Sequence, residues 1–304
     1  MKGTIVKSTG SWYDILGEEK KKYKGRLRGK FKNHGLKVTN PIAVGDIVEF
    51  ELEANSNESA IITDILKRDN YLIRKAIQKS GHGHLIATNL DQTILLATLV
   101  SPVTSTGFID RFLVSNEAFR IPTVIVFNKI DLYDNKTKQR QKDLSEIYEK
   151  LGYQCFGTSA VSKEGMDGFK AILKNKKSLI AGHSGVGKST LINVIVPWLD
   201  LKTSEISNFN EKGVHSTTFA EMFEIEENTF LIDTPGIKEL GLFEIGEDEL
   251  AHYFPEMRNL LGQCKFHDCK HVNEPKCAVI EKVNSGEIAL SRYQSYLKML
   301  ANED

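Results

Sequence analysis

The residues that decide the fold are Gly182-His183-Ser184-Gly185-Val186-Gly187-Lys188-Ser189, which join a strand-like run, Ser178–Ala181, to a helix-like run, Thr190–Val196. They match the phosphate-loop pattern G-x-x-x-x-G-K-[ST] in full. Glycines let successive backbone N–H groups turn toward phosphate oxygens, and the helix that begins at Thr190 directs its positive dipole end to the same point. Lys188 adds a positive charge beside the β- and γ-phosphates, and Ser189 supplies an oxygen to Mg²⁺. This stretch predicts a nucleoside triphosphate site.

Around this loop, strand-like and helix-like runs alternate from Thr93 to Asp233. This alternation predicts an α/β layered domain with a largely parallel sheet. The expected strands are Thr93–Val100, Thr123–Phe127, Tyr153–Thr158, Ser178–Ala181, and a hairpin of Thr218–Ile225 and Thr229–Asp233, with a helix at Asp143–Leu151.

Two short motifs predict that the base is guanine. Asn128-Lys129-Ile130-Asp131 follows the strand Thr123–Phe127 and matches the N-K-x-D motif of GTPases. There the Asp carboxylate accepts two hydrogen bonds from guanine, whereas adenine offers no such donors and leaves the acceptor unpaired at a cost of about 1–3 kcal/mol. Thr158-Ser159-Ala160 resembles the loop that supports guanine O6. We therefore expect GTP and GDP, with Asn128, Lys129, Asp131, Thr158, Ser159 and Ala160 at the base.

The remaining nucleotide motifs concern Mg²⁺ and the γ-phosphate. Asp233-Thr234-Pro235-Gly236 matches D-x-x-G, so Asp233 would hold Mg²⁺ through water and the Gly236 N–H would contact the γ-phosphate. A threonine of the preceding segment, either Thr217 or Thr218, would ligate Mg²⁺ as part of switch I.

The order of these motifs is circularly permuted. The N-K-I-D motif precedes the phosphate loop, whereas ordinary small GTPases have the reverse order. Because the ends of a compact domain often lie close together, joining them and opening the chain elsewhere is tolerated. Here the opening follows Gly236, so switch II runs directly into residues 240–304. We expect the nucleotide state to reach that region along the chain.

The catalytic group is a separate question. Many GTPases place a Gln after D-x-x-G to orient the attacking water, but this chain has Ile237. His215, in the switch I segment, is the candidate catalytic residue; the alternative is a purely structural loop histidine. Hydrolysis by the isolated protein is therefore expected to be slow.

The N-terminal 70 residues predict a small β-barrel of the OB type, because five short strand-like runs are separated by Gly, Asn and Pro. Residues 1–37 carry a net charge of +8, balanced by −8 on the rest of the chain. Aromatic residues lie among these cations, a combination that suits single-stranded nucleic acid. A solvated hairpin face and aromatic side chains in the barrel core are the alternatives.

Near the C-terminus, Cys264, Cys269, His271 and Cys277 supply three thiolates and an imidazole within 14 residues. Such a closed Cys₃His set predicts one structural Zn²⁺. His267 is the alternative imidazole ligand. Cys155, within an apolar run, is expected in the core.

We expect three domains: an OB-fold RNA-binding domain at 1–70, a permuted GTPase domain at 71–238 and a mainly helical zinc-binding domain at 239–304. Within residues 70–90, a basic stretch is followed by Ser80-Gly81-His82-Gly83-His84, which we expect to form a flexible connection. The sequence has no run of about 18 apolar residues and no recognisable signal peptide, so a cytoplasmic protein with no membrane contact is expected. We also expect a monomer.

Permuted motifs, a basic barrel and a Cys/His region together resemble the ribosome small subunit-dependent GTPase A family of bacterial assembly factors, over essentially the whole chain. The closest matches are Leu27-Arg28-Gly29-Lys30, Asn40–Asp46, Phe108–Leu113 and Gly182–Ser189. The resemblance implies GTP hydrolysis stimulated by the small ribosomal subunit during late maturation, with 16S ribosomal RNA contacted by barrel and zinc domain. The family's switch I usually reads H-T-T, whereas this chain has His215-Ser216-Thr217.

Two other classes share some of these features. A P-loop ATPase or kinase is disfavoured by the N-K-I-D motif, and competition between ATP and GTP separates it from a GTPase. An RNA-binding zinc protein that uses the nucleotide as a switch without turnover is the second. Measuring GTP turnover with and without ribosomal subunits separates this class from a GTPase.

Overall fold

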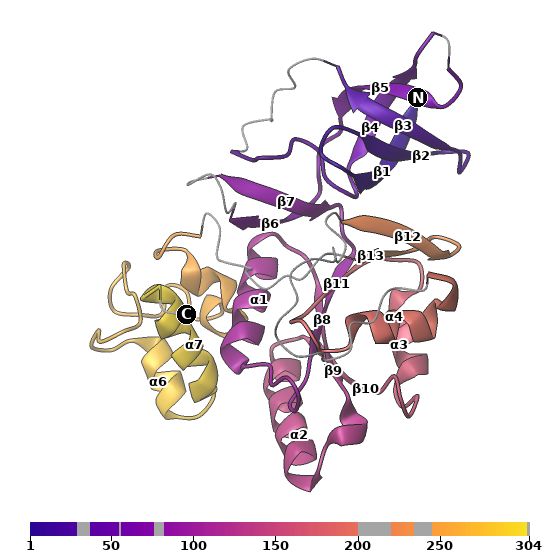
Figure 1. Cartoon of the computed structure of the whole chain (residues 1–304). Helices are drawn as coiled ribbons and strands as arrows, with labels where there is room; N and C mark the ends of the chain where they lie inside the picture. Colours follow the sequence, from indigo (N-terminus) through magenta and orange to yellow (C-terminus); the bar gives the residue numbers. More distant parts are fainter. Residues whose placement is uncertain (29–36, 55, 76–81, 200–219, 234–244, 303–304) are drawn as a thin grey trace, which may run out of the picture.

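The computed structural model describes residues 1–28, 37–54, 56–75, 82–199, 220–233 and 245–302. Figure 1 shows a β-barrel at the N-terminal end, a central sheet flanked by helices, and a helical region at the C-terminal end. This architecture confirms the predicted fold class. Within the described ranges, no helix is both long and apolar enough to cross a membrane.

The N-terminal barrel closes because β1 pairs with both β2 and β4 while β3 runs parallel to β5. Tyr13 and Tyr23 are buried in its core beside Phe50, whereas Trp12 is 49% exposed. The two tyrosines therefore stabilise the barrel, and Trp12 remains an accessible aromatic side chain. The barrel strands are β1 (Lys2–Ser8), β2 (Tyr13–Gly17), β3 (Lys22–Leu27), β4 (Ile47–Leu52) and β5 (Ser59–Ile65).

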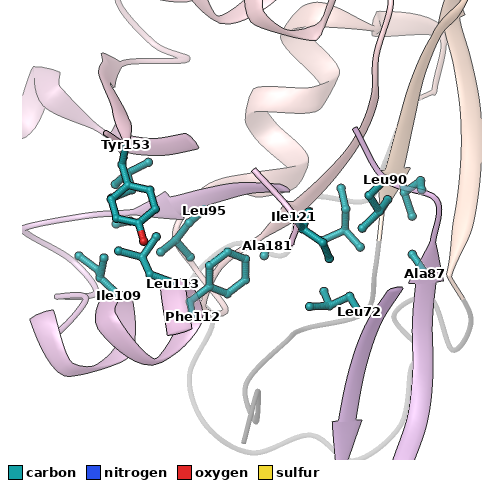
Figure 2. Packing of buried hydrophobic residues seen from close by; sticks show 14 of the residues in the cluster. Leu72, Ala87, Leu90, Leu95, Ile109, Phe112, Leu113, Ile121, Tyr153 and Ala181 are labelled. Carbon is teal, nitrogen blue, oxygen red and sulfur yellow. The ribbon is translucent and has the colours of Figure 1, made fainter. Parts of the chain in front are cut away.

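The predicted flexible connection over residues 80–84 is wrong for Gly83 and His84, which belong to a strand. Residues 80 and 81 lie outside the described parts of the chain. Strands β6 (Tyr71–Lys75) and β7 (Gly83–Thr88) pair as an antiparallel hairpin. Leu72 and Ala87 are buried in the same cluster as Ile121 of the central part (Figure 2). Basic residues and histidines interrupt the apolar pattern here, so only packing against the central part reveals the strands.

The central part has an α/β/α arrangement around the strand order β10-β9-β8-β11-β13-β12. Helices α1 and α2 cover one face and α3 and α4 the other; Figure 2 shows Phe112 and Leu113 of α1 in one cluster with Leu95 of β8. All neighbours in this sheet are parallel except β12, which is antiparallel to β13. The elements are β8 (Gln92–Ala97), α1 (Thr106–Ala118), β9 (Thr123–Asn128), η1 (Ile130–Leu132), α2 (Asn135–Lys150), β10 (Gln154–Thr158), α3 (Met166–Leu173), β11 (Lys177–Ala181), α4 (Lys188–Ile195), η2 (Pro197–Leu199), β12 (Glu221–Glu226) and β13 (Thr229–Asp233).

Helix α2 begins two turns earlier than the predicted Asp143–Leu151. The Asp134 carboxylate accepts a hydrogen bond from the Thr137 N–H at 2.8 Å and caps the helix. The first turns of α2 are polar and show no apolar periodicity. The capping residue Asp134 was therefore the sequence feature that could have predicted the earlier start of the helix.

Barrel and central sheet meet at β1 and β12, which pair at Lys7 and Glu221. The same two side chains form an ion pair at 2.8 Å, and Lys20 pairs with Glu224 at 2.8 Å. Part of the positive charge of the barrel thus faces β12, the strand that follows the segment predicted to be switch I.

The C-terminal region is joined to α1 by a buried network of charges. Arg292 of α7 donates to Asp110 of α1 at 2.7 Å and to Glu256 at 2.8 Å, and Tyr148 of α2 donates to Asp110 at 3.0 Å. Burial raises the pKa of Asp110 although Arg292 opposes that effect. The elements are η3 (Leu250–Tyr253), α5 (Pro255–Arg258), α6 (Ala278–Asn284) and α7 (Leu290–Leu300).

Another buried ion pair lies where the barrel meets the hairpin, and it supports a stability prediction. Arg68 donates two hydrogen bonds of 2.7 Å to Asp46, whose side chain is fully buried and also accepts from Thr88. Arg68→Ala leaves this carboxylate without its cation and should cost about 3–5 kcal/mol of unfolding free energy. Arg26→Ala, which breaks an exposed pair with Glu53, should cost less than about 1 kcal/mol.

Urea denaturation of the two variants and the native protein measures this difference. Equal unfolding midpoints for Arg68→Ala and Arg26→Ala would contradict it.

Candidate functional site

The base and phosphate motifs meet at one edge of the central sheet, where the parallel strands have their carboxyl ends. Asn128 ends β9 and is paired with Thr158 at the end of β10. The phosphate loop follows Ala181 of β11, and Asp233 ends β13 beside Ile180. Ligands of open α/β sheets bind at this edge. The structure thus brings together motifs that are far apart in the chain.

Close contacts explain the glycines of the phosphate loop. A Cβ added at Gly182 would lie 2.5 Å from the Leu96 carbonyl oxygen, and one at Gly187 would lie 2.6 Å from Asn128 Nδ2. Gly185 and Gly187 also have positive φ angles of 81° and 93°. These positions therefore need glycine if the loop is to lie against the neighbouring strand ends.

Lys188 and Ser189 lie in the first turn of α4, as the sequence predicts. Lys188 Nζ donates to the carbonyl oxygens of Gly182 and His183 at 2.7 and 3.2 Å. The ammonium group therefore lies over the loop, where its charge would face a phosphate group bound there. Thr190 is exposed on the same turn.

Asn128 connects three loops of the site. Its side-chain N–H donates to the Val186 carbonyl in the phosphate loop at 2.8 Å. Its side-chain oxygen accepts from the Thr158 hydroxyl at 3.1 Å. Both polar atoms of the amide are thereby used, and the Asn128 side chain is buried. Asn128 is thus a structural member of the site.

Lys129 bridges the phosphate loop and the loop that follows β8. With a left-handed backbone (φ 62°), it directs Nζ to the carbonyl oxygens of Ser101 and Gly185, both at 2.7 Å. Burial lowers the pKa of Lys129, and nearby Asp131 opposes this shift. Asp131 itself is exposed at the middle of η1. Its carboxylate is therefore accessible to a base.

The third loop is held by Ser159. Its hydroxyl accepts from the backbone N–H groups of Val161 and Ser162 at 3.1 and 3.0 Å. Its own N–H donates to the Glu164 carbonyl at 3.0 Å. Ala160, within this turn, is partly exposed.

Four predicted residues lie outside the described parts of the chain: His215, Thr217, Thr218 and Gly236. Ile237 also lies outside them.

Sequence reasoning missed the contribution of the loop between β8 and α1. Pro102 lies beside Gly185 of the phosphate loop, where an added Cβ would be 3.4 Å from its Cδ. At the start of α1, the Phe108 ring lies 3.7 Å from the His183 ring, centroid to centroid. The loop follows the carboxyl end of β8, and this position could have predicted that it contributes to the site.

The four predicted metal ligands form one cluster. His271 Nδ1 lies 3.6 Å from Cys264 Sγ and 3.3 Å from Cys277 Sγ, and these two sulfurs are 3.9 Å apart. Together with Cys269 Sγ, all ligand atoms lie within 4.8 Å of one another. Tetrahedral zinc with three sulfurs and one nitrogen implies separations of about 3.5–3.8 Å. The donor set therefore fits a bound metal ion.

Other side chains position the loop that carries these ligands. Tyr293 and Tyr296 of α7 donate to the carbonyl oxygens of His271 and Lys270 at 2.7 and 2.8 Å. The Glu274 carboxylate accepts from the backbone N–H groups of Lys270 and Val272. His267 is exposed and is not part of the cluster, so the geometry favours His271 as the imidazole ligand.

Comparisons with known proteins cover almost the entire chain. The family model described as RsgA GTPase matches residues 65–243, and the RsgA N-terminal domain model matches residues 2–61. A protein of Cytophaga hutchinsonii named small ribosomal subunit biogenesis GTPase RsgA is 56% identical, with 100% of this chain and 99% of that protein covered. The protein of the same name from Christiangramia forsetii is 49% identical, with 100% of this chain and 97% of that protein covered.

Two solved structures have the same fold. The crystal structure of YjeQ from Thermotoga maritima matches with a TM-score of 0.79 and 39% identity, covering 99% of this chain and 97% of that chain. YloQ, described as a circularly permuted GTPase, matches with a TM-score of 0.75 and 30% identity. This match covers 99% of this chain and 94% of that chain. The permutation predicted from the motif order is therefore confirmed. The chain belongs to the RsgA GTPase family, and its enzymatic activity is that of a GTPase.

Proposed function

We propose that this GTPase binds the small ribosomal subunit and assists its late maturation, hydrolysing GTP to GDP and phosphate with turnover that the subunit stimulates. The observation that carries the proposal is similarity along the full length to proteins named small ribosomal subunit biogenesis GTPases, at 56% and 49% identity. The convergence of the nucleotide motifs at one sheet edge supports it.

In this proposal each part of the site has a role. The phosphate loop and Lys188 bind the phosphates, while Asn128 and Lys129 hold the loops together. Asp131 selects guanine by accepting from its N1–H and 2-amino groups, and Ser159 and Ala160 support the O6 side. Ser189, Asp233 and Thr217 or Thr218 hold Mg²⁺, whose charge would stabilise the phosphate oxygens.

The barrel, residues 1–70, would contact 16S ribosomal RNA together with the metal region, residues 239–304, while residues 71–238 bind nucleotide. Exposed Trp12 and the excess of Lys and Arg in residues 1–37 suit single-stranded RNA. We further propose that the protein acts as a cytoplasmic monomer.

Guanine selection by Asp131 is directly testable. Asp131→Asn replaces an acceptor by a donor, so affinity for GTP should fall at least about tenfold while xanthosine triphosphate becomes the better ligand. Asp134→Asn is the matched control, because Asp134 is three residues away and caps α2. Competition binding with GTP, xanthosine triphosphate and ATP measures the preference. Equal binding of ATP and GTP by the native protein would refute the guanine assignment.

The metal is proposed to be zinc, one ion per chain, held by Cys264, Cys269, His271 and Cys277. When bound, it would cross-link a loop-rich segment and so contribute to its folding. Elemental analysis should find about one equivalent of zinc, and Cys264→Ser should lose most of it while GTP binding is retained.

Cys155→Ser serves as the control for that experiment, because Cys155 lies in β10 and outside the cluster. Protein purified without chelator that contains no metal, or mainly a different one, would overturn the zinc assignment.

Stimulated hydrolysis is proposed to depend on His215, because Ile237 has no side-chain group to orient water. Docking on the subunit would bring the imidazole to the attacking water. Positioned proton-transfer groups contribute roughly 10²–10⁴-fold, so His215→Ala should lose much of the stimulation. GTP affinity should be retained, because the phosphate loop and Asp131 are unchanged.

Single-turnover hydrolysis with and without purified small subunits measures this effect, with His252→Ala, an exposed histidine of the C-terminal region, as control. If His215→Ala is stimulated as strongly as the native protein, another group orients the water. If the native protein shows no turnover even with subunits, the nucleotide acts as a switch without hydrolysis.

A further inference from the structure

The turn that carries Asp131 is closed by a buried tyrosine hydroxyl. Tyr133 Oη donates to the carbonyl oxygen of Asn128 at 3.0 Å, so the side chain returns to the residue at which the turn begins. Tyr133 Oη in turn accepts a hydrogen bond from the Leu99 N–H at 3.0 Å. Tyr133 is only 5% exposed, and burial raises its pKa, so the hydroxyl keeps the proton that it donates.

Asp131 lies between these two fixed ends. The Leu132 N–H donates to the Lys129 carbonyl at 3.0 Å, and the Tyr133 N–H donates to the Ile130 carbonyl at 3.1 Å, which makes one tight turn. Asn128 anchors the start of the turn through the phosphate loop, and Tyr133 anchors its end. The direction of the Asp131 carboxylate therefore depends on both anchors.

Tyr133 also fixes the loop that follows β8. Leu99 is the second residue of this loop, and two residues later the Ser101 carbonyl accepts from Lys129. The hydroxyl of Tyr133 and the ammonium of Lys129 thus bind the same loop at neighbouring points. Because Lys129 also bonds to Gly185, the loop, the base-binding turn and the phosphate loop form one hydrogen-bonded unit.

We propose that Tyr133 is a positioning residue for guanine selection: its hydroxyl holds the turn so that both oxygens of Asp131 meet the N1–H and 2-amino groups together. The inference rests on the proposed role of Asp131. A hydrogen bond weakens steeply when its angle or length departs from the optimum, and a two-point contact is more sensitive than a single one.

The test compares Tyr133→Phe with Tyr153→Phe. The control loses a hydrogen bond of the same length, 3.0 Å from Tyr153 Oη to Glu117, from a tyrosine that is 7% exposed in the same part of the molecule. Equilibrium affinities are measured for GTP, GDP and inosine triphosphate, which lacks the 2-amino group. Thermal unfolding of each variant is recorded alongside.

For Tyr133→Phe, affinities for GTP and GDP should both fall, by about three- to tenfold, because the base is common to both nucleotides. The affinity for inosine triphosphate should fall less, because this nucleotide makes only one of the two hydrogen bonds to Asp131. The preference for GTP over inosine triphosphate should therefore fall in Tyr133→Phe and stay at the native value in Tyr153→Phe.

Two negative results are distinguishable. If the native protein binds GTP and inosine triphosphate equally, the proposed guanine contact of Asp131 is wrong, and the inference fails with it. If the native preference is present and Tyr133→Phe keeps it, the guanine assignment stands and Tyr133 has no positioning role, even if the variant is less stable to heat.

Discussion

The hydrogen bond from the Asn128 side chain to the Val186 carbonyl is the contact on which the nucleotide site depends. It joins two loops that are 58 residues apart in the chain and spans only 2.8 Å. The closeness explains why Gly187 has no side chain, since a Cβ there would meet the same amide nitrogen. Buried amides are costly unless paired, so the Thr158 hydroxyl, which satisfies the other side of Asn128, is part of the same constraint.

This constraint is independent of the order in which the chain visits the strands. In the sheet, β11 lies between β8 and β13, although it follows β9 and β10 in the sequence. Parallel strands place their carboxyl ends at one edge whatever their connections, so the motifs meet there after permutation. What the permutation changes is the neighbour of the segment predicted to be switch II. The segment after Asp233 leads to the metal region, which α1 also holds through the buried Asp110–Arg292 pair.

Charged groups also attach the barrel. Asp46 and Arg68 form a buried pair beside Thr88 of the hairpin, whereas Lys7 and Lys20 form more exposed pairs with β12. Removing one member of a buried pair leaves a charge without compensation, while an exposed pair contributes little. The buried pair thus stabilises the part of the barrel that contacts the hairpin through Thr88, and the exposed pairs with β12 contribute less.

The sequence by itself determined the barrel, the α/β part, the permutation and the Cys₃His set, because each rests on local periodicity or on residue types at short spacing. Only the tertiary structure showed the hairpin of β6 and β7, the burial of Arg292 and the hydrogen bond from the Tyr133 hydroxyl to the Asn128 carbonyl. It also favoured His271 over His267, because only His271 faces the thiol groups. These features depend on contacts between residues distant in the chain, and a charge or hydroxyl in a sequence does not reveal whether folding will bury it with a partner.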